Sequence, residues 1–247
     1  MLQKAKNYTK LVKSYCKTQG CSLVGIADIS NIKEEFSVSQ SVMEKMSYAI
    51  CFGLQLSKAI LAELVNQPTR LYFHHYRTVN TALDQIALKI SNFIQQKGFL
   101  ALPIPASQIL DWQRQTAHLS HKKIALLAGI GWLGRNNLLV TEEFGSQIRL
   151  ATVLTDMPLL ADKPIVRDCA LCRACISVCP AQAIKESPQD FEYLKCFEKL
   201  KEFQRQHLVD QYVCGVCVNV CGPKVKKSRK SQNNKKGVVS AKEDSNC

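Results

Sequence analysis

Residues 169–184 read CALCRACISVCPAQAI, with four cysteines in eleven positions and a proline directly after the last one. The spacing C-x2-C-x2-C-x3-C-P is formed by Cys169, Cys172, Cys175, Cys179 and Pro180. Three thiolates at every third residue can hold three corners of an iron–sulfur cubane, whereas the fourth thiolate of such a run ligates a second cluster. The pattern therefore predicts two clusters.

A second group of cysteines follows, as two clusters require. It consists of Cys196, Cys214, Cys217 and Cys221, and Gly222-Pro223 comes next. With the crossover of the fourth thiolate, we expect one [4Fe–4S] cluster on Cys169, Cys172, Cys175 and Cys221, and the other on Cys179, Cys196, Cys214 and Cys217. Structural zinc is the alternative, but it favours paired C-x2-C units, which fit the triple repeat and its proline poorly.

The composition indicates a protein with a real hydrophobic core and reduced thiols. The chain has 247 residues, 46% of them hydrophobic, and twelve cysteines. Its first residues lack the apolar stretch of a secretory signal, and its apolar runs are shorter than the roughly 18 residues of a membrane span. We therefore expect a soluble cytoplasmic protein, in which Cys16, Cys21 and Cys51 are core thiols and Cys247 belongs to a tail.

Periodicity predicts an α/β (α+β) fold. Helical patterns cover residues 2–19, 78–98 and 112–128, and strand-like patterns cover 21–29, 48–56, 137–140 and 147–156, with 99–105 short and apolar. The last two strands are joined through Phe144-Gly145. Gly98 should end the long helix, whose apolar side chains share one face and should pack on a sheet.

The amino-acid composition of the chain changes after Asp156. We place a domain boundary near residue 162, which separates residues 1–162 from a cysteine-rich unit at 163–223. Residues 224–247 are almost free of apolar side chains and are expected to be a disordered basic tail. The tail supplies +6 of the net charge of +13, which fits either an RNA partner or a solubilising surface.

Three further stretches contain residues that could bind a ligand or take part in a reaction. The sequence GIGWLG (129–134) satisfies G-x-G-x-x-G, but it follows a helix-like segment and precedes a strand, the reverse of a dinucleotide site. LYFHHYR (71–77) gathers groups that could position or protonate a ligand, or form a structural patch. HLSHKK (118–123) places two histidines three apart on a helix, where they are more often surface residues than ligands.

The combined motifs resemble the epoxyqueuosine reductase family and, more distantly, the reductive dehalogenases. The resemblance rests on HKKIALLAGIGWLGRNNLLVTEEFGSQIRLATVLTDMPL followed by the two cysteine groups. It implies a nitroreductase-like domain that binds cobalamin base-off, and a ferredoxin-like domain that feeds it electrons. The family segment G-W-x-G-[KR]-N-x-L-L assigns Gly131, Gly134, Arg135 and Asn136 to the cofactor site. The D-x-H-x-x-G motif, which supplies a histidine ligand to cobalt in other cobalamin proteins, is absent.

The resemblance also suggests a proton donor and partners. Family members that act on tRNA carry a catalytic aspartate where this chain reads His74-His75-Tyr76-Arg77, so His75 or Tyr76 would replace it. Those members continue into a helical-repeat region that helps to hold tRNA, whereas a lysine-rich tail follows here. The resemblance therefore leaves two candidates: a protein that acts on tRNA, and a relative with altered chemistry and another substrate. An external low-potential donor of the ferredoxin or flavodoxin type would supply electrons.

Two alternatives remain open at this point. The chain could be a ferredoxin-like electron carrier whose N-terminal domain docks a partner enzyme and binds no corrin. It could also be a reductase that holds a flavin in the nitroreductase-like domain. Corrin content and the absorption spectrum distinguish the three.

Overall fold

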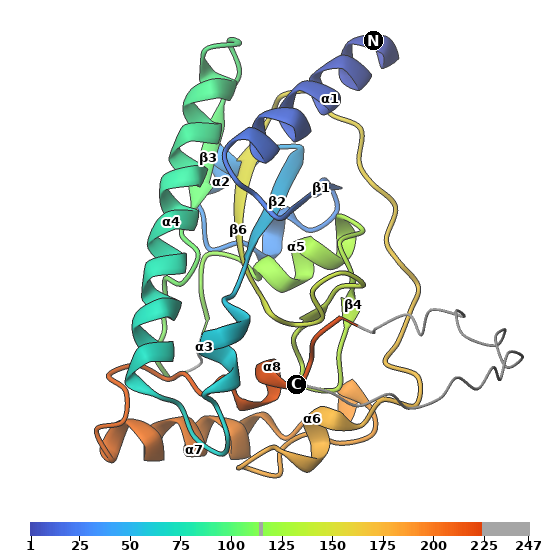
Figure 1. The fold of residues 1–247 in the computed structure, drawn as a ribbon. Coiled ribbons are helices and arrows are strands. Elements are labelled where there is room, and N and C mark those ends of the chain that lie inside the picture. The colour runs from blue at the N-terminus through green and yellow to red at the C-terminus, as the bar shows by residue number, and fades with distance from the viewer. Residues whose placement is uncertain (114–115, 224–247) are drawn as a thin grey trace, which may run out of the picture.

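A computed structural model of the protein describes residues 1–113 and 116–223 (Figure 1). The predicted basic tail with Cys247 lies outside the described residues. The helices are α1 (Leu2–Thr18), α2 (Gln40–Met43), α3 (Lys58–Ala62), α4 (Arg70–Gln95), α5 (His121–Leu127), α6 (Ala174–Ser177), α7 (Tyr193–Arg205) and α8 (Val216–Asn219). The strands are β1 (Leu23–Asp28), β2 (Tyr48–Gln55), β3 (Ala101–Ile104), β4 (Trp132–Leu133), β5 (Leu139–Val140) and β6 (Ile148–Thr155), and short 3-10 turns span Lys33–Glu35 and Pro188–Asp190.

Four strands form an antiparallel sheet in the order β1-β2-β6-β3. Strands β2 and β6 pair over their full length, with Phe52 opposite Ala151. Since both faces of these central strands are covered, their residues are almost continuously buried. The predicted strands at 21–29, 48–56, 137–140 and 147–156 are confirmed with slightly shorter bounds.

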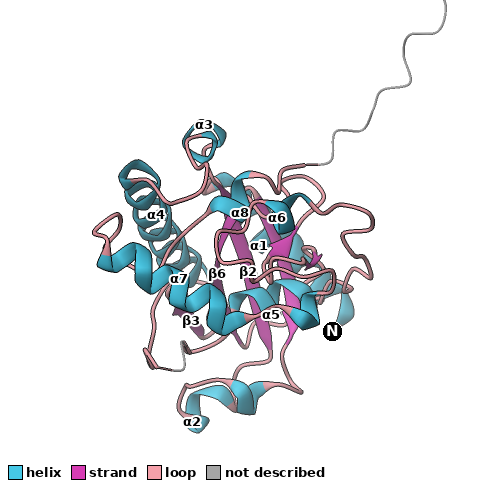
Figure 2. Cartoon of the chain, turned by 90° about the horizontal axis from the view of Figure 1, so that it is seen from below, coloured by secondary structure: helices cyan, strands magenta, loops and turns pink. Residues whose placement is uncertain are grey.

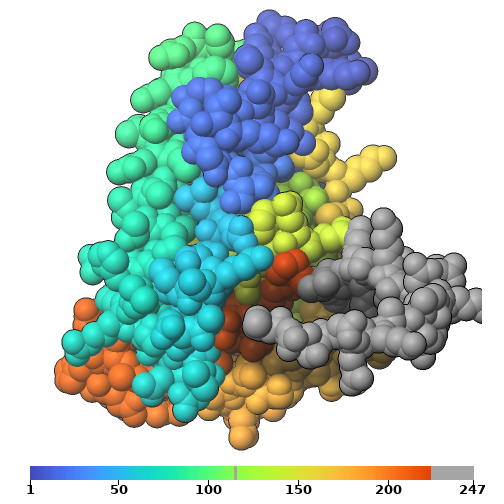
Figure 3. Space-filling model, viewed as in Figure 1, coloured from blue at the N-terminus to red at the C-terminus, as the bar shows by residue number. Residues whose placement is uncertain are grey.

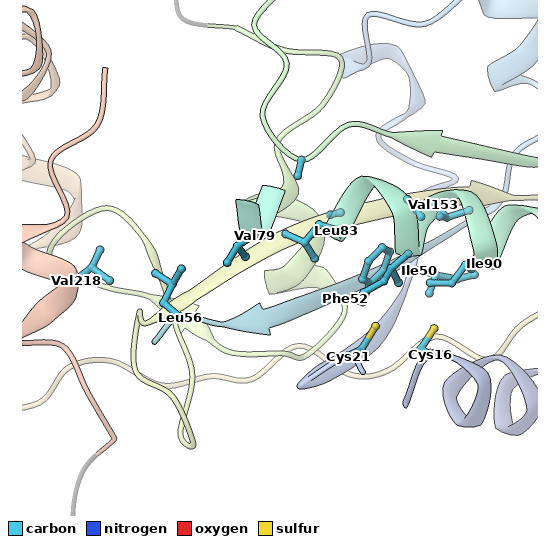
Figure 4. Packing of buried hydrophobic residues seen from close by; sticks show 14 of the residues in the cluster. Cys16, Cys21, Ile50, Phe52, Leu56, Val79, Leu83, Ile90, Val153 and Val218 are labelled. Atoms are coloured by element: carbon cyan, nitrogen blue, oxygen red, sulfur yellow. The ribbon is translucent and has the colours of Figure 1, made fainter. Parts of the chain in front are cut away.

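Helices cover both faces of the sheet, which confirms the α/β prediction. Helices α1 and α4 lie on one face, where Phe52, Leu83 and Ile90 belong to the larger core (Figure 4). Helix α5 lies on the other face, with Ile124 and Leu154 in a second core. The expected core thiols Cys16, Cys21 and Cys51 are buried.

Helix α4 begins eight residues earlier than its apolar periodicity predicts. Thr69 caps it, because its hydroxyl accepts a hydrogen bond from the Tyr72 amide at 3.1 Å. The predicted stop holds, since Gly98 adopts the left-handed conformation (φ +83°) just after the helix. The histidine–tyrosine segment at 71–77 is therefore the first two turns of α4.

The predicted helix at 112–128 is wrong in its first half. Helix α5 begins only at His121, because the Ser120 hydroxyl accepts from the Lys123 amide and caps it there. The GIGWLG stretch follows α5 and runs into the β4–β5 hairpin, where Trp132 pairs with Val140. It does not open a helix, as the sequence predicted.

The cysteine-rich segment forms the base of the molecule as drawn in Figures 1 and 3, and Figure 2 shows α6, α7 and α8 from that side. Its side chains Phe203, Val209, Val213 and Val218 belong to the same core as α4 and β2. The core thus runs across the predicted boundary at residue 162, and the division into domains stays a prediction. Within residues 1–113 and 116–223, no helix is long and apolar enough to cross a membrane.

Candidate functional site

We call Cys169, Cys172, Cys175 and Cys221, which the crossover assigns to one cluster, the first cysteine set. Burial, and then the neighbouring thiols of Cys221, Cys169 and Cys172, raise the pKa of the Cys175 thiol to about 11. Cys221 interacts in the same way with Cys169 and Cys172. Cys172 is exposed to solvent. The fold therefore brings these four thiols near one another, and one of them, Cys172, is exposed to solvent.

The second set consists of Cys179, Cys196, Cys214 and Cys217. Burial raises the pKa of Cys214 to about 12 and that of Cys196 to about 11, and the nearby Cys179 raises both. Burial raises the pKa of Cys217 well above its usual value, and its thiol neighbours include Cys214, Cys196, Cys179 and, last, Cys175 of the first set. The two sets are therefore adjacent.

The donor chemistry of both sets fits iron–sulfur clusters. Burial and the neighbouring thiols make the thiolate form of these cysteines unfavourable. Iron removes this cost, because it binds the thiolates and neutralises their charge. In the described part of the chain, no three His, Cys, Asp or Glu side chains converge as a single metal ion requires. A cubane keeps its four thiolates apart, one at each iron corner.

A cavity of about 440 Å³ lies between the second set and the end of the sheet, within the size range of ligand pockets. Its wall includes Cys196, Cys214 and Cys217. The other walls come mainly from α4, α5, α7, residues 136–139 and the start of β6. They include Leu56, Tyr72, Tyr76, Ala106, His121, Lys122, Asn136, Leu138, Leu139, Ile148, Arg149, Leu150, Tyr193, Leu200, Tyr212 and Val213. A ligand in this mostly apolar cavity would contact the second set directly.

Tyr76 and Arg149 form the main polar group of the cavity. The Arg149 guanidinium lies 4.3 Å from the centre of the Tyr76 ring and donates to the Asn80 side chain at 3.0 Å. Burial raises the pKa of Tyr76, but Arg149 and hydrogen bonds to Ser107 and Asn80 outweigh it, so the pKa lies below its usual value. None of the carboxylates in the described residues pairs with Arg149.

Lys122 and His121 complete the polar wall. Lys122 donates to the Asn137 carbonyl and side chain, both at 2.8 Å, and burial lowers its pKa. His121 contacts Thr152 at 2.8 Å and the Pro105 carbonyl at 2.9 Å. Burial lowers its pKa to about 4, so the ring is neutral at pH 7 and donates from Nε2 to the carbonyl. His121 is half-buried and lines the cavity, so it is not the freely exposed histidine that its helical spacing with His118 suggested.

The structure separates the two residues predicted as proton donors. Tyr76 lines the cavity, whereas His75 is not part of its wall. The His75 Nε2 accepts a hydrogen bond from the Ser57 amide at 3.0 Å, at the start of α3. Burial lowers the pKa of His75, and the neighbouring His74 lowers it further. Of the two predicted donors, only Tyr76 can reach a ligand in the cavity.

The residues predicted to bind the cofactor lie at the β4–β5 hairpin. Gly131 and Gly134 let its two strands approach, since a Cβ would lie 2.1 Å from the Val140 carbonyl oxygen or 2.5 Å from the Val140 side chain. Asn136 is part of the cavity wall. Arg135 instead donates to carbonyls of the cysteine-rich segment.

Comparison with known proteins tests the resemblance to epoxyqueuosine reductases. An epoxyqueuosine reductase of Cyclobacterium marinum is 25% identical over 245 residues, which cover 87% of this chain and 79% of that protein. A tetrachloroethene reductive dehalogenase of Desulfitobacterium hafniense is 34% identical over 139 residues, 54% of this chain and 23% of that protein. The resemblance to epoxyqueuosine reductases is confirmed. No family model matches the sequence.

Solved structures agree on the fold. A reductive dehalogenase, described with a mechanism for B12-dependent dehalogenation, matches 90% of this chain with a TM-score of 0.69 and 16% identity. An epoxyqueuosine reductase with an epoxyqueuosine-modified tRNA stem loop matches 87% with a TM-score of 0.59 and 19% identity. The chain spans 32% of the first and 64% of the second. Both relatives are oxidoreductases, the predicted class of enzyme.

Sequence reasoning missed Arg149, Lys122 and His121 as members of one site. Both Lys122 and Arg149 stand inside the stretch that carries the family resemblance. A basic residue at the start of a buried strand, as in QIRLATVL, is the signal that could have singled out Arg149.

Proposed function

We propose that the protein is a reductase of the epoxyqueuosine reductase type, which uses two [4Fe–4S] clusters and a cobalamin. One observation carries the proposal: the cavity has three cysteines of the second set in one wall and the Tyr76–Arg149 pair in another. Electrons that arrive at the second set would therefore reach a ligand that also contacts a proton donor. The B12-dependent relative supports cobalamin as that ligand.

The chain's own residues would hold these groups in defined places. The two cysteine sets would ligate the clusters, and Leu138, Leu139 and Leu150 would give the corrin an apolar, water-poor wall. When bound, the clusters supply single electrons at low potential and the cobalamin supplies a cobalt centre that can transfer them to a substrate. Because Cys172 is exposed, the first set would be the entry point for electrons from a ferredoxin- or flavodoxin-type donor.

Tyr76 would donate the proton that the reduction requires. Its hydroxyl contacts the Ser107 hydroxyl at 3.2 Å, and its ring lies against Arg149. The guanidinium stabilises the phenolate that is left after the proton is transferred. Arg149 therefore makes Tyr76 a stronger acid, and solvent can return the proton after turnover.

The substrate proposal follows the relatives. The epoxyqueuosine reductase structure contains a modified tRNA stem loop, and we propose a modified tRNA as the first substrate to test. The cationic Arg149 and Lys122 in the cavity would attract a polar or anionic substrate group.

Anaerobic reconstitution followed by metal analysis tests this function. We expect about eight irons and eight sulfides per chain, and a base-off cob(II)alamin spectrum at corrinoid concentrations of roughly tens of micromolar. Bound flavin without corrin would instead support the flavin reductase. Two clusters with neither ligand would support the electron carrier, and about four irons or stoichiometric zinc would contradict the two-cluster assignment.

A further inference from the structure

Arg135 reaches the cysteine-rich segment, not the cavity to which the resemblance assigns it. Its side chain is not part of the cavity wall. The guanidinium donates to the carbonyls of Glu186, Cys172 and Ala170 at 2.7, 2.8 and 2.8 Å. The side chain is only 13% exposed, so water competes little for these bonds. One buried fork of donors therefore ties two stretches of the cysteine-rich segment to the turn of the β4–β5 hairpin.

The loop that Arg135 holds lies between Cys169 and Cys172. Ala170 in this loop has φ +46°, which is unfavourable for a residue with a Cβ. The Asp168 side chain accepts from the Ala170 amide at 2.8 Å, and Arg135 binds the Ala170 carbonyl on the other side. The Cys172 amide donates to the Cys169 carbonyl at 3.0 Å and closes the turn. The bonds from Arg135 therefore stabilise a strained turn that fixes the positions of both cysteines.

Arg135 also brings a positive charge to the first set. The Glu186 carboxylate lies 3.6 Å from the Arg135 Nε but is 61% exposed, and Arg173 contacts the same carboxylate at 2.6 Å. Glu186 therefore neutralises Arg135 only in part, since its charge is shared with Arg173 and screened by water. Thiolate ligands give an iron–sulfur cluster a net negative charge, which a buried cation nearby stabilises.

We propose that Arg135 is a positioning residue for the first cluster: it holds the loop of Cys169 and Cys172 in the conformation that keeps iron bound. The inference rests on the proposed function, since it needs the cluster. The same turn is tied to the cavity, because Asn137 lies in the cavity wall and accepts from Lys122 at 2.8 Å through its backbone and its side chain. Arg135 would therefore fix the first cluster relative to the ligand in the cavity.

Iron release to a chelator from reconstituted protein without corrinoid tests the proposal. Electron paramagnetic resonance of dithionite-reduced samples assigns the loss to a cluster, and the signal that Cys172→Ala lacks marks the first one. Arg135→Met leaves three buried carbonyls without this donor, so the first cluster should lose iron about tenfold faster. Arg135→Lys keeps the charge but not the planar fork, and its rate should lie between those of the parent and Arg135→Met. The second cluster is the internal reference and should keep its parent rate in both variants.

Arg173→Gln is the matched control. It removes an arginine next to Cys172 that is 59% exposed and donates to the Glu186 carboxylate at 2.6 Å, so iron release should not change. An Arg135→Met variant that loads only the second cluster would support the proposal, and Arg135→Lys decides if the methionine variant does not fold. Parent rates in the Arg135 variants, or equal losses from both clusters, would overturn this inference but not the proposed function. A parent protein that never binds two clusters would overturn both.

Discussion

The two cysteine sets have the same ligands but opposite surroundings. The first set contains the exposed Cys172, and hydrophobic Leu171 beside it is 86% exposed. The second set contains Cys214 and Cys217, which belong to the wall of the cavity and pack against the main core. Under the proposed function, position in the fold and not ligand chemistry would give each set its role: the first would face external electron donors and the second the ligand in the cavity.

Substitution of single cysteines should have the largest effect of the tests of this difference between the two sets. Cys172→Ala should abolish the first cluster, and Cys179→Ala and Cys214→Ala should each abolish the second, so that about four irons remain in every case. Iron analysis and electron paramagnetic resonance measure this. With dithionite as a small reductant, Cys172→Ala should keep some reduction of the cavity ligand, whereas Cys214→Ala should lose it. The two sets would be wrongly drawn if Cys172→Ala and Cys179→Ala removed the same signal.

Two left-handed glycines allow the sets to be damaged separately. Gly145→Ala would push a methyl against the Cys221 carbonyl, and Gly215→Ala would push one to 2.5 Å from the Tyr72 ring. Strain and overpacking together should cost about 2–5 kcal/mol of unfolding free energy, with loss of the first or the second cluster signal respectively.

Gly20→Ala is the matched control for these glycines. Gly20 has φ +90° but nothing within 4 Å of its Cβ position, so only the backbone strain of about 1–2 kcal/mol remains. Denaturant unfolding compares the three variants. An equal loss in all of them would show that the close contacts do not matter.

Tyr76→Phe tests proton donation in the cavity next to the second cysteine set. Turnover should fall on the order of a hundredfold, because a general acid is lost, while corrin binding is retained. His75→Ala should keep turnover and lose about 1 kcal/mol of stability, since only the hydrogen bond to the Ser57 amide is removed. Steady-state rates and unfolding curves measure both. The reverse result would assign the proton to His75.

The pH dependence of stability gives the most gradual expected effect. The folded-state pKa of His121, about 4, lies below its ordinary value of 6.5, so the unfolded chain binds the additional proton between these values. Stability should therefore fall as the pH decreases through this window, by about 2 kcal/mol between pH 7 and pH 5. His121→Gln should flatten this part of the curve. An unchanged slope would mean that the burial of His121 is not its cause.

The grouping of the cysteines into two sets could be proposed from sequence because their spacing is local and the crossover rule supplies the pairing; their role as cluster ligands stays a prediction. The cavity could not be predicted in the same way. Arg149 lies near the start of β6, Lys122 lies in α5 and Tyr76 in α4. Only the antiparallel pairing of the sheet and the packing of its helices bring them together. Tyr76 and His75 are neighbours in sequence, so their different partners became visible only with the position of α3.

Under the proposed function, the shared core would link the supply of iron to the lifetime of the protein. Val213 and Val218 flank the second-set cysteines and pack into the core that holds α4 and β2. In a chain without iron, several buried thiols would lie beside one another with no metal to hold them in place. Val213 and Val218 would then pack less firmly, and the packing of the main sheet would loosen with them. We therefore expect cellular proteases to remove iron-free chains selectively, so that the abundance of the protein follows the iron status of the cell.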